Sequence, residues 1–142
     1  MDFKLELVLI PVADVDRAKA FYTEKAGFKL DVDHQAGESF RVVQLTPPGS
    51  ACSITFGIGI TDAAPGSVRG THLVVSDIEA ARAELVERGL EVTEIRHFNV
   101  ESSAWLPGPD PEHADYASFA DFSDADGNTW ILQEVHHRDR DA

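Results

Sequence analysis

A cysteine, a pair of aspartates and an isolated tryptophan are the first residues of this sequence to consider as chemical groups. Cys52 has no histidine partner in the sequence and no glycine-rich helix start beside it, which favours a buried structural thiol over a nucleophile. Asp124 and Asp126 resemble part of a calcium loop, but the later glutamate of an EF-hand is missing, which favours a turn. Trp105 could stack on a planar ligand, anchor its loop or enter a subunit interface.

The elements that must position these residues form two similar halves. Val12-Ala13-Asp14 recurs as Val75-Ser76-Asp77, and an Ala-rich amphipathic segment follows each motif at residues 15–26 and 78–88. Each segment ends at a glycine, which tolerates the left-handed conformation that closes a helix. The repeat predicts two helices, each preceded by a short apolar strand.

The residues before each helix indicate how the helix begins. Asp14 can cap the first helix, and Asp77 places negative charge at the positive end of the second helix. Ser76 and Glu79 have the spacing of a capping box. We expect both aspartates to cap their helices and the Ser76–Glu79 pair to close the start of the second one.

Alternating apolar residues and turn sequences predict three further strands in each half. With the leading strands, the expected ranges are 5–12, 28–33, 39–45 and 51–58 in the first half, and 71–75, 90–96, 117–122 and 129–135 in the second. Each half is then a βαβββ module of an α+β fold. We expect a single domain over residues 1–136, with modules at about 3–60 and 68–135.

Residues 98–116 form a proline-rich insertion in the second half. A connection of this length is typical of a lid or a disordered segment, and Trp105, Leu106 and Tyr116 argue against complete disorder. Residues 137–142 are expected to form a flexible tail.

The composition limits the class of function. The chain has 142 residues, with 12 Lys and Arg against 25 Asp and Glu and a formal net charge of −13. Nucleic acids and anionic membranes attract clustered basic side chains, so neither is an expected partner. The sequence lacks the basic start of a signal peptide, and a single cysteine cannot form an internal disulfide. We therefore expect a protein of the reducing cytoplasm.

The two modules resemble the vicinal oxygen chelate superfamily, which includes glyoxalases, bleomycin resistance proteins and extradiol dioxygenases. The likeness is carried by Val12-Ala13-Asp14, by Ala20-Phe21-Tyr22 with Gly27-Phe28, and by the segment from Asp124 to Trp130. The resemblance implies curved sheets that form an eight-stranded, incompletely closed barrel around a cavity. It also implies a homodimer with two equivalent sites.

The same resemblance implies where a metal would bind. The family's ligand positions correspond here to Leu7, Gly70 and Ile131, and to a residue within Ser53–Phe56. None of these has an imidazole or a carboxylate, and Zn²⁺ or Fe²⁺ needs about three N, O or S donors. We expect no metal at the family's usual position and no resident cofactor.

The resemblance further implies a mostly apolar cavity with a few polar points. Strand alternation predicts that Leu7, Leu9, His72, Val74, Ile131 and Gln133 bind the ligand, and the lid is expected to add Trp105 and Phe98. His72 is expected either to be a hydrogen-bonded interior histidine or to orient a polar group of a ligand.

Three functional hypotheses follow. The first is a cytoplasmic homodimer that binds a small apolar or aromatic molecule, by sequestration or recognition, as bleomycin-resistance-like members do. The second is a lyase, isomerase or dioxygenase with a divalent metal relocated to His72 and Gln133, joined by His97, Glu101 or His113. The third is a structural or regulatory dimer whose cavity is filled by its own side chains.

Overall fold

The computed structural model describes residues 1–136, which divide into two compact units. The first unit contains Met1–Arg69 together with Asp124–Asn128, and the second contains Gly70–Ser123 and the described residues from Thr129 onward. The expected tail at 137–142 lies outside the described residues. The two sheets, of four and five strands, and the two helices confirm an α+β fold of two modules.

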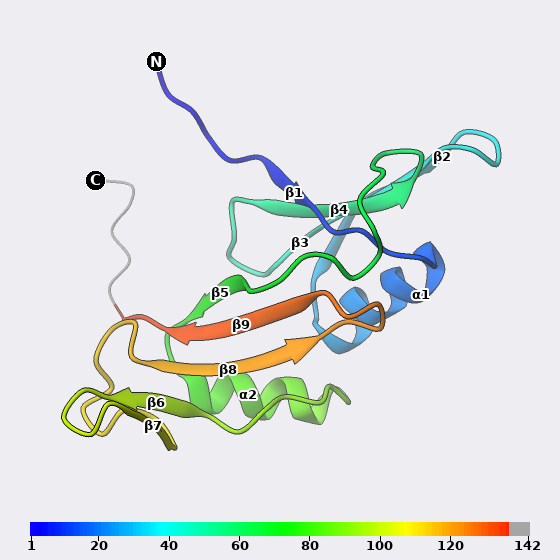
Figure 1. Ribbon diagram of the computed structural model, residues 1–142. Helices are drawn as coiled ribbons and strands as arrows, with labels where there is room; N and C mark the ends of the chain where they lie inside the picture. The colour runs from blue at the N-terminus through cyan, green and yellow to red at the C-terminus, as the bar shows by residue number, and fades with distance from the viewer. Residues whose placement is uncertain (137–142) are drawn as a thin grey trace. The chain divides into compact units, whose positions relative to one another are not determined.

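The first unit has the predicted β-α-β-β-β order (Figure 1). Its elements are β1 (Leu7–Leu9), α1 (Val15–Ala20), the π-helical turn η1 (Phe21–Lys25), β2 (Lys29–Gln35), β3 (Arg41–Thr46) and β4 (Ser53–Ile58). The sheet order is β1-β4-β3-β2, with β1 parallel to β4 and the other pairs antiparallel. Asp14 caps α1, as predicted, because its side chain accepts a hydrogen bond from the Arg17 backbone N–H at 3.0 Å.

An aromatic core joins the helix to the sheet in the first unit. The Tyr22 ring is fully buried, with its centroid 5.8 Å from that of Phe56 on β4 and 5.7 Å from that of Phe28. Val43 and Leu45 of β3 are buried as well. The apolar side of the amphipathic segment predicted at 15–26 therefore packs on this sheet.

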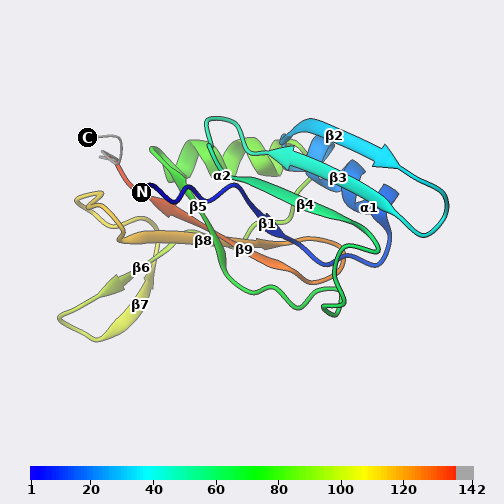
Figure 2. The same ribbon diagram turned by 90° about the horizontal axis from the view of Figure 1, so that it is seen from above.

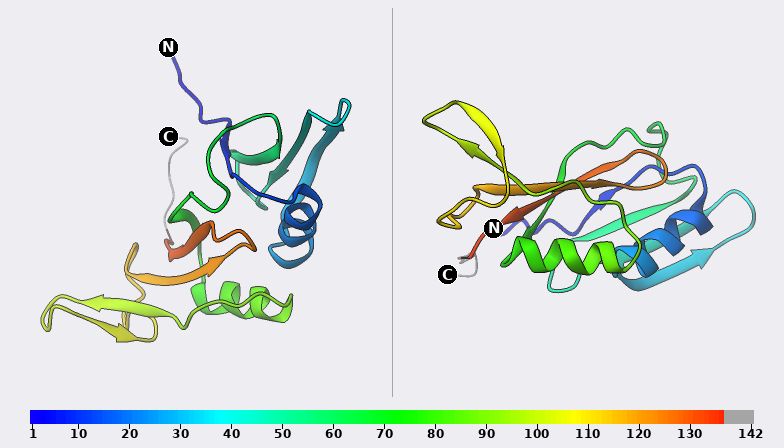
Figure 3. Two further views of the ribbon diagram at one scale, coloured as in Figure 1. Left: turned by 45° about the vertical axis from the view of Figure 1, so that its right-hand side comes forward. Right: turned by 90° about the horizontal axis from the view of Figure 1, so that it is seen from below.

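The second unit has one strand more than its module predicts. Its elements are β5 (Thr71–Val75), α2 (Ile78–Glu87), β6 (Arg96–Asn99), β7 (Ala104–Pro107), β8 (Ser118–Ser123) and β9 (Thr129–Glu134), in the sheet order β5-β9-β8-β6-β7. The helix α2 runs along one face of this sheet, near β8 and β9 (Figure 3). Figure 2 shows β6 and β7 as a hairpin at the edge of the sheet next to β8.

Two predictions for the second unit are wrong in their boundaries. Residues 90–95 are not a strand, because their backbone is bonded elsewhere: the Arg82 guanidinium donates to the carbonyls of Val92 and Thr93. The strand begins only at Arg96, and it continues into the insertion predicted at 98–116. That insertion is therefore partly a hairpin of the sheet, and only the segment after Pro107 is a loop.

The predicted Ser76–Glu79 capping box is also wrong. Asp77 is the N-cap of α2 and accepts from the Ala80 backbone N–H at 3.0 Å. A buried glutamate of β9, Glu134, accepts from the backbone N–H of Ile78 at 2.9 Å. These two carboxylates satisfy the free N–H groups at the helix start, so Asp77 caps the helix as expected but without the serine.

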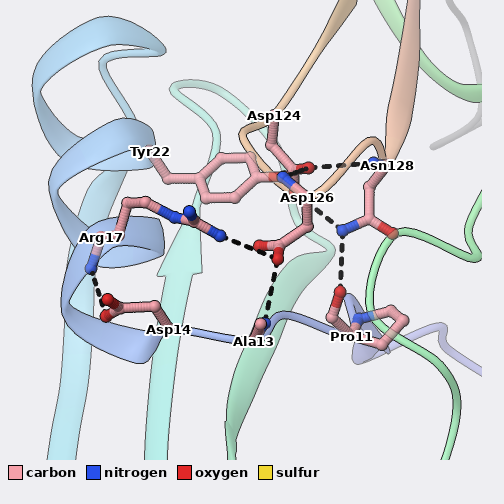
Figure 4. Close-up of polar contacts among 8 residues, drawn as sticks. All are labelled: Pro11, Ala13, Asp14, Arg17, Tyr22, Asp124, Asp126 and Asn128. Carbon is pink, nitrogen blue, oxygen red and sulfur yellow. Dashed lines mark hydrogen bonds and ion pairs between the residues drawn. The ribbon is translucent and has the colours of Figure 1, made fainter.

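The turn from Asp124 to Asn128 belongs to the first unit, although β8 and β9 of the second unit flank it (Figure 4). The buried Asp124 carboxylate accepts from the Tyr22 hydroxyl at 2.7 Å, from the Asn128 side-chain amide at 2.8 Å, and from the backbone N–H groups of Asp126 and Asn128. The interpretation of this motif as a turn is thereby confirmed, because its carboxylate is occupied by hydrogen-bond donors.

Asn128 continues the network to two other segments. Its side-chain amide donates to the Pro11 carbonyl at 2.9 Å, and its side-chain oxygen accepts from the Val68 backbone N–H at 3.1 Å. Asp126 adds a hydrogen bond from the Ala13 backbone N–H and an ion pair with Arg17 (Figure 4). The turn at 124–128, distant in sequence, thus bonds the residues before α1 and the segment around Val68.

Removal of the Asn128 side chain should destabilise the protein strongly. In Asn128→Ala, the Pro11 carbonyl and the Val68 N–H lose their partner, so the free energy of unfolding is expected to fall by about 2–3 kcal/mol. Urea unfolding followed by circular dichroism measures the change. Glu38→Ala, at an exposed residue, is the matched control and should change stability little. Equal stability of both variants would contradict the structural role of the turn.

Candidate functional site

The open face of the second unit's sheet, the face opposite α2, carries most of the predicted site residues. In the register of β5 and β9, His72 lies opposite Ile131 and Val74 lies opposite Gln133. Residues directly opposite each other in neighbouring strands point to the same face of the sheet. Alternate residues of β9, such as Trp130 and Leu132, are buried on the other face. The structure therefore brings four of the seven predicted residues onto one face.

The strands β8 and β6 extend this face. Phe119 lies opposite Gln133, and Arg96 lies opposite Phe119. Phe98, two residues beyond Arg96, lies opposite Trp105 of β7. The predicted residue Trp105 thus joins the same face through the hairpin.

Three aromatic rings form a connected cluster on the open face. The ring centroid of Trp105 lies 5.4 Å from that of Phe98 and 5.6 Å from that of Phe119, both in edge-to-face geometry. Trp105 is 52% exposed and Phe98 is 43% exposed. Edge-to-face contacts fix the rings against one another while leaving ring surface available for another aromatic group.

A guanidinium lies over this cluster. The Arg96 Cζ atom is 5.2 Å from the ring centroid of Trp105 and 5.9 Å from that of Phe119. Its Nη2 atom donates to Oδ1 of Asp121 at 3.2 Å. The attraction between a cation and an exposed aromatic ring stabilises their contact by about 0.5–1 kcal/mol. The hydrogen bond to Asp121 fixes the direction of the guanidinium.

His72 is not the interior histidine that one prediction describes. Its side chain is exposed, and its Nδ1 atom lies 2.7 Å from the Gly70 carbonyl oxygen. A carbonyl oxygen only accepts, so Nδ1 carries a proton, and in the neutral ring Nε2 is left as an acceptor toward the open face. The prediction that His72 orients a ligand group remains a prediction.

Gln133 is bonded to a loop of the second unit, whereas Leu7 and Leu9 lie in the first unit. The Gln133 side-chain amide donates to the Tyr116 carbonyl at 3.3 Å, so it is tied to the loop after β7. Leu7 and Leu9 lie on β1 of the first unit, and Leu9 is 41% exposed. The predicted lining is therefore divided between the two units, five residues in the second and two in the first.

The family's metal positions do not fit a metal in this chain. Leu7 lies on β1, Ile131 lies on β9, and Gly70 has no side chain. The matching place on β4 lies within Ser53–Phe56, where the Ser53 hydroxyl is hydrogen-bonded to the Thr46 hydroxyl at 2.7 Å. Among residues 1–136, no group of three or more His, Cys, Asp or Glu side chains is placed to hold an ion.

The residues expected to complete a relocated metal site are either bonded to other groups or exposed in a turn. His97 is buried, and its Nδ1 atom lies 2.8 Å from the Gly108 carbonyl oxygen. Glu101 is exposed in the turn between β6 and β7. His113 lies 2.9 Å from Glu134, whose other oxygen accepts from the start of α2.

A hollow of about 370 Å³ lies outside the open face. It is lined by Glu79, Arg82, Ala83, Glu94, Ile95, Pro107, Gly108 and Pro109. The Arg82 guanidinium is already bonded to backbone carbonyls, and no side chain of the aromatic cluster reaches this lining. The hollow therefore adds nothing to the candidate site.

Sequence reasoning missed Arg96, Phe119 and Asp121. Phe119 and Asp121 share a face of β8, and Arg96 joins them only through the register of β6 with β8, two strands that the hairpin and the loop after β7 separate in sequence. A signal was present in the alternation around residues 96–107, where two short runs flank a turn at 100–103.

A histidine–glutamate pair fastens the loop after β7 to the sheet. Glu134 is buried, and it faces His113 at 2.9 Å and His136 at 3.5 Å. The hydrogen bond to this carboxylate raises the pKa of His113 above its usual value of 6.5, with smaller contributions from Glu79 and Asp110. Tyr116 in the same loop donates its backbone N–H to the Glu134 carbonyl.

Comparisons with known proteins agree with this architecture. The family model of the glyoxalase/bleomycin resistance protein/dioxygenase superfamily matches residues 4–132. The chain belongs to this superfamily, which confirms the resemblance predicted from its motifs.

Two solved structures and one curated protein are similar over nearly the whole chain. The antibiotic-binding protein TnmS3 from Streptomyces sp. CB03234 is 33% identical, with 94% of this chain and 97% of that one covered and a TM-score of 0.71. A glyoxalase/bleomycin resistance protein from the same organism is 34% identical, with 92% and 100% covered and a TM-score of 0.68. The uncharacterized protein YetH of Bacillus subtilis (strain 168) is 25% identical over 130 residues, which cover 89% of this chain and 94% of YetH.

Neither of the two helices described has the length and apolar character that crossing a bilayer requires.

The ion pair of His113 with Glu134 predicts a pH dependence of stability. Because the pKa of His113 is raised in the folded state, its contribution is complete below pH 6.5 and is lost as the pH rises through the folded pKa. His113→Asn should flatten this dependence above pH 6.5, and asparagine tolerates the positive φ of 50° at this position.

Chemical denaturation at a series of pH values measures the effect. The control is His34→Asn, at an exposed histidine that forms no ion pair among the residues described, and it should retain the wild-type slope. An unchanged slope in His113→Asn would show that the pair does not stabilise the loop.

Proposed function

We propose that this chain binds small aromatic molecules on the open face of its second unit and acts by sequestration or recognition. The observation that carries the proposal is the cluster of Phe98, Trp105 and Phe119, whose rings are fixed against one another and partly exposed. Binding sites for small molecules combine apolar and aromatic surface with a few polar groups. Here His72, Gln133 and Arg96 supply the polar groups of the same face.

The similarity to TnmS3 supports the proposal. That protein is described as antibiotic-binding, and it covers nearly the whole of this chain at 33% identity. The superfamily fold alone does not define a function, because one scaffold carries several activities. The residues of the open face therefore carry the functional proposal, and the relative supports their interpretation.

The magnitude of the expected contact is adequate for specific binding. Covering the exposed half of an indole ring and stacking a second ring on it contributes about 2–3 kcal/mol. That is more than a tenfold effect on the dissociation constant. Trp105 should therefore be the largest single contributor to affinity.

We further propose an oligomeric state, a compartment and a class of partner. We propose a homodimer in the cytoplasm with a small molecule as its partner and without a metal in the binding step. The acidic net charge of −13 and the single cysteine support a partner other than nucleic acid and a reducing compartment. The residues at the family's metal positions support binding without an ion.

Replacement of Trp105 should weaken aromatic binding. With 2-naphthalenemethanol as the probe, Trp105→Ala is expected to raise the dissociation constant by about tenfold or more, because the stacking surface is removed. Isothermal titration calorimetry measures the affinity. Phe3→Ala, at an aromatic side chain that is 90% exposed in the other unit, is the matched control and should bind like the wild type.

Two outcomes of this experiment would count against the proposal. Equal affinity in Trp105→Ala and the wild type would place binding elsewhere. If Trp105→Ala instead lowers the molar mass in light scattering without changing affinity, the open face is a subunit contact, as in the hypothesis of a structural dimer.

A further inference from the structure

Arg96 is the one arginine of the second unit that lies on the open face, among the residues described. Arg82 and Arg88 belong to α2 and its C-cap, and the four lysines of the chain are all in the first unit. Of the described residues of this unit, Arg96 alone therefore presents a guanidinium to a negatively charged group that approaches the aromatic cluster. The chain as a whole has a net charge of −13, so a basic side chain beside the aromatic cluster differs from the acidic character of the rest.

The guanidinium is held in place but retains free donors. Asp121 bonds to Nη2 at 3.2 Å, and the faces of Trp105 and Phe119 support Cζ at 5.2 and 5.9 Å. Within the described residues, Nε and Nη1 of Arg96 donate to no other group. The Arg96 side chain is only 31% exposed, so its direction is set before a ligand arrives.

These contacts define a chemical class of ligand. A carboxylate or phenolate oxygen accepts strong, charge-assisted hydrogen bonds from a guanidinium. If that oxygen group is attached directly to an aromatic ring, the ring falls beside Trp105, because the guanidinium and the indole are in contact. A neutral aromatic molecule would stack on the indole and offer the free donors of Arg96 no charged acceptor.

We propose that Arg96 is a specificity-determining residue that selects aromatic acids, meaning planar rings with an attached carboxylate or phenolate, over neutral aromatic molecules. The inference rests on the proposed function and makes it more specific. It requires that Asp121 keeps its bond to Nη2 while the ligand oxygen takes the other donors.

The test compares two probes that share one ring system. 2-Naphthoate carries a carboxylate where 2-naphthalenemethanol carries a neutral hydroxymethyl group, and calorimetry at physiological ionic strength gives both dissociation constants. The wild-type protein is expected to bind naphthoate about tenfold more tightly, the size of one charge-assisted hydrogen bond. Arg96→Met should remove this preference, because methionine keeps apolar contact with Trp105 but has no charge.

Two further variants separate charge from folding. Arg96→Lys keeps the cation and should retain most of the preference for naphthoate. Arg88→Met removes one positive charge at the C-cap of α2 and should leave both affinities as in the wild type. Circular dichroism establishes that each variant is folded.

The outcomes distinguish this inference from the proposed function. Equal binding of the two probes by the wild type, or unchanged preference in Arg96→Met, overturns the role of Arg96 and leaves aromatic binding intact. Failure of the wild type to bind either probe overturns both proposals. If Arg96→Met dissociates a dimer in light scattering and leaves both affinities unchanged, the face pairs two copies of the chain and the inference is wrong.

Discussion

The first unit depends on a buried turn that comes from the far end of the chain. Asp124 accepts four hydrogen bonds, and both donors and the oxygen of the Asn128 side chain have partners. A buried amide that is only partly satisfied costs free energy, whereas a complete network specifies one arrangement. The Pro11 carbonyl and the Val68 N–H have hydrogen-bond partners only when the turn takes this conformation. The turn also bonds the Ala13 N–H, and it thereby fixes the position at which α1 begins.

This network explains what the family resemblance could and could not predict. Two of the motifs that carry the likeness contact each other, because the Tyr22 hydroxyl of the Ala20-Phe21-Tyr22 motif donates to Asp124 of the last motif. Their residues are occupied with holding the fold, so they report the architecture and contain no information on a ligand. The fold could be predicted from them, and the site had to be sought among residues outside the motifs.

Strand alternation predicted part of the candidate site because a period of two does not depend on the partner strand. It placed His72 with Val74 and Ile131 with Gln133, and the register of β5 and β9 brings all four to one face. It failed at residues 90–95, where buried Leu90, Val92 and Ile95 mimic a strand while Arg82 occupies the backbone carbonyls. Arg96 could not be placed this way, since only the register of β6 with β8 brings it beside Phe119 and Asp121.

The balance of charge on the open face differs from that of the whole chain. At physiological ionic strength charges are screened beyond about 8 Å, so the net charge of −13 has little influence on a group in contact with Arg96. The pair with Asp121 is neutral as a whole, which keeps the guanidinium oriented over Trp105 without creating a strongly positive surface. An anion gains binding free energy only at short range, where its oxygen reaches the free donors of Arg96. An aromatic ring gains binding free energy only where it covers the indole. Both conditions are met together by a molecule in which acid and ring are directly joined, and this joint requirement gives the face its selectivity.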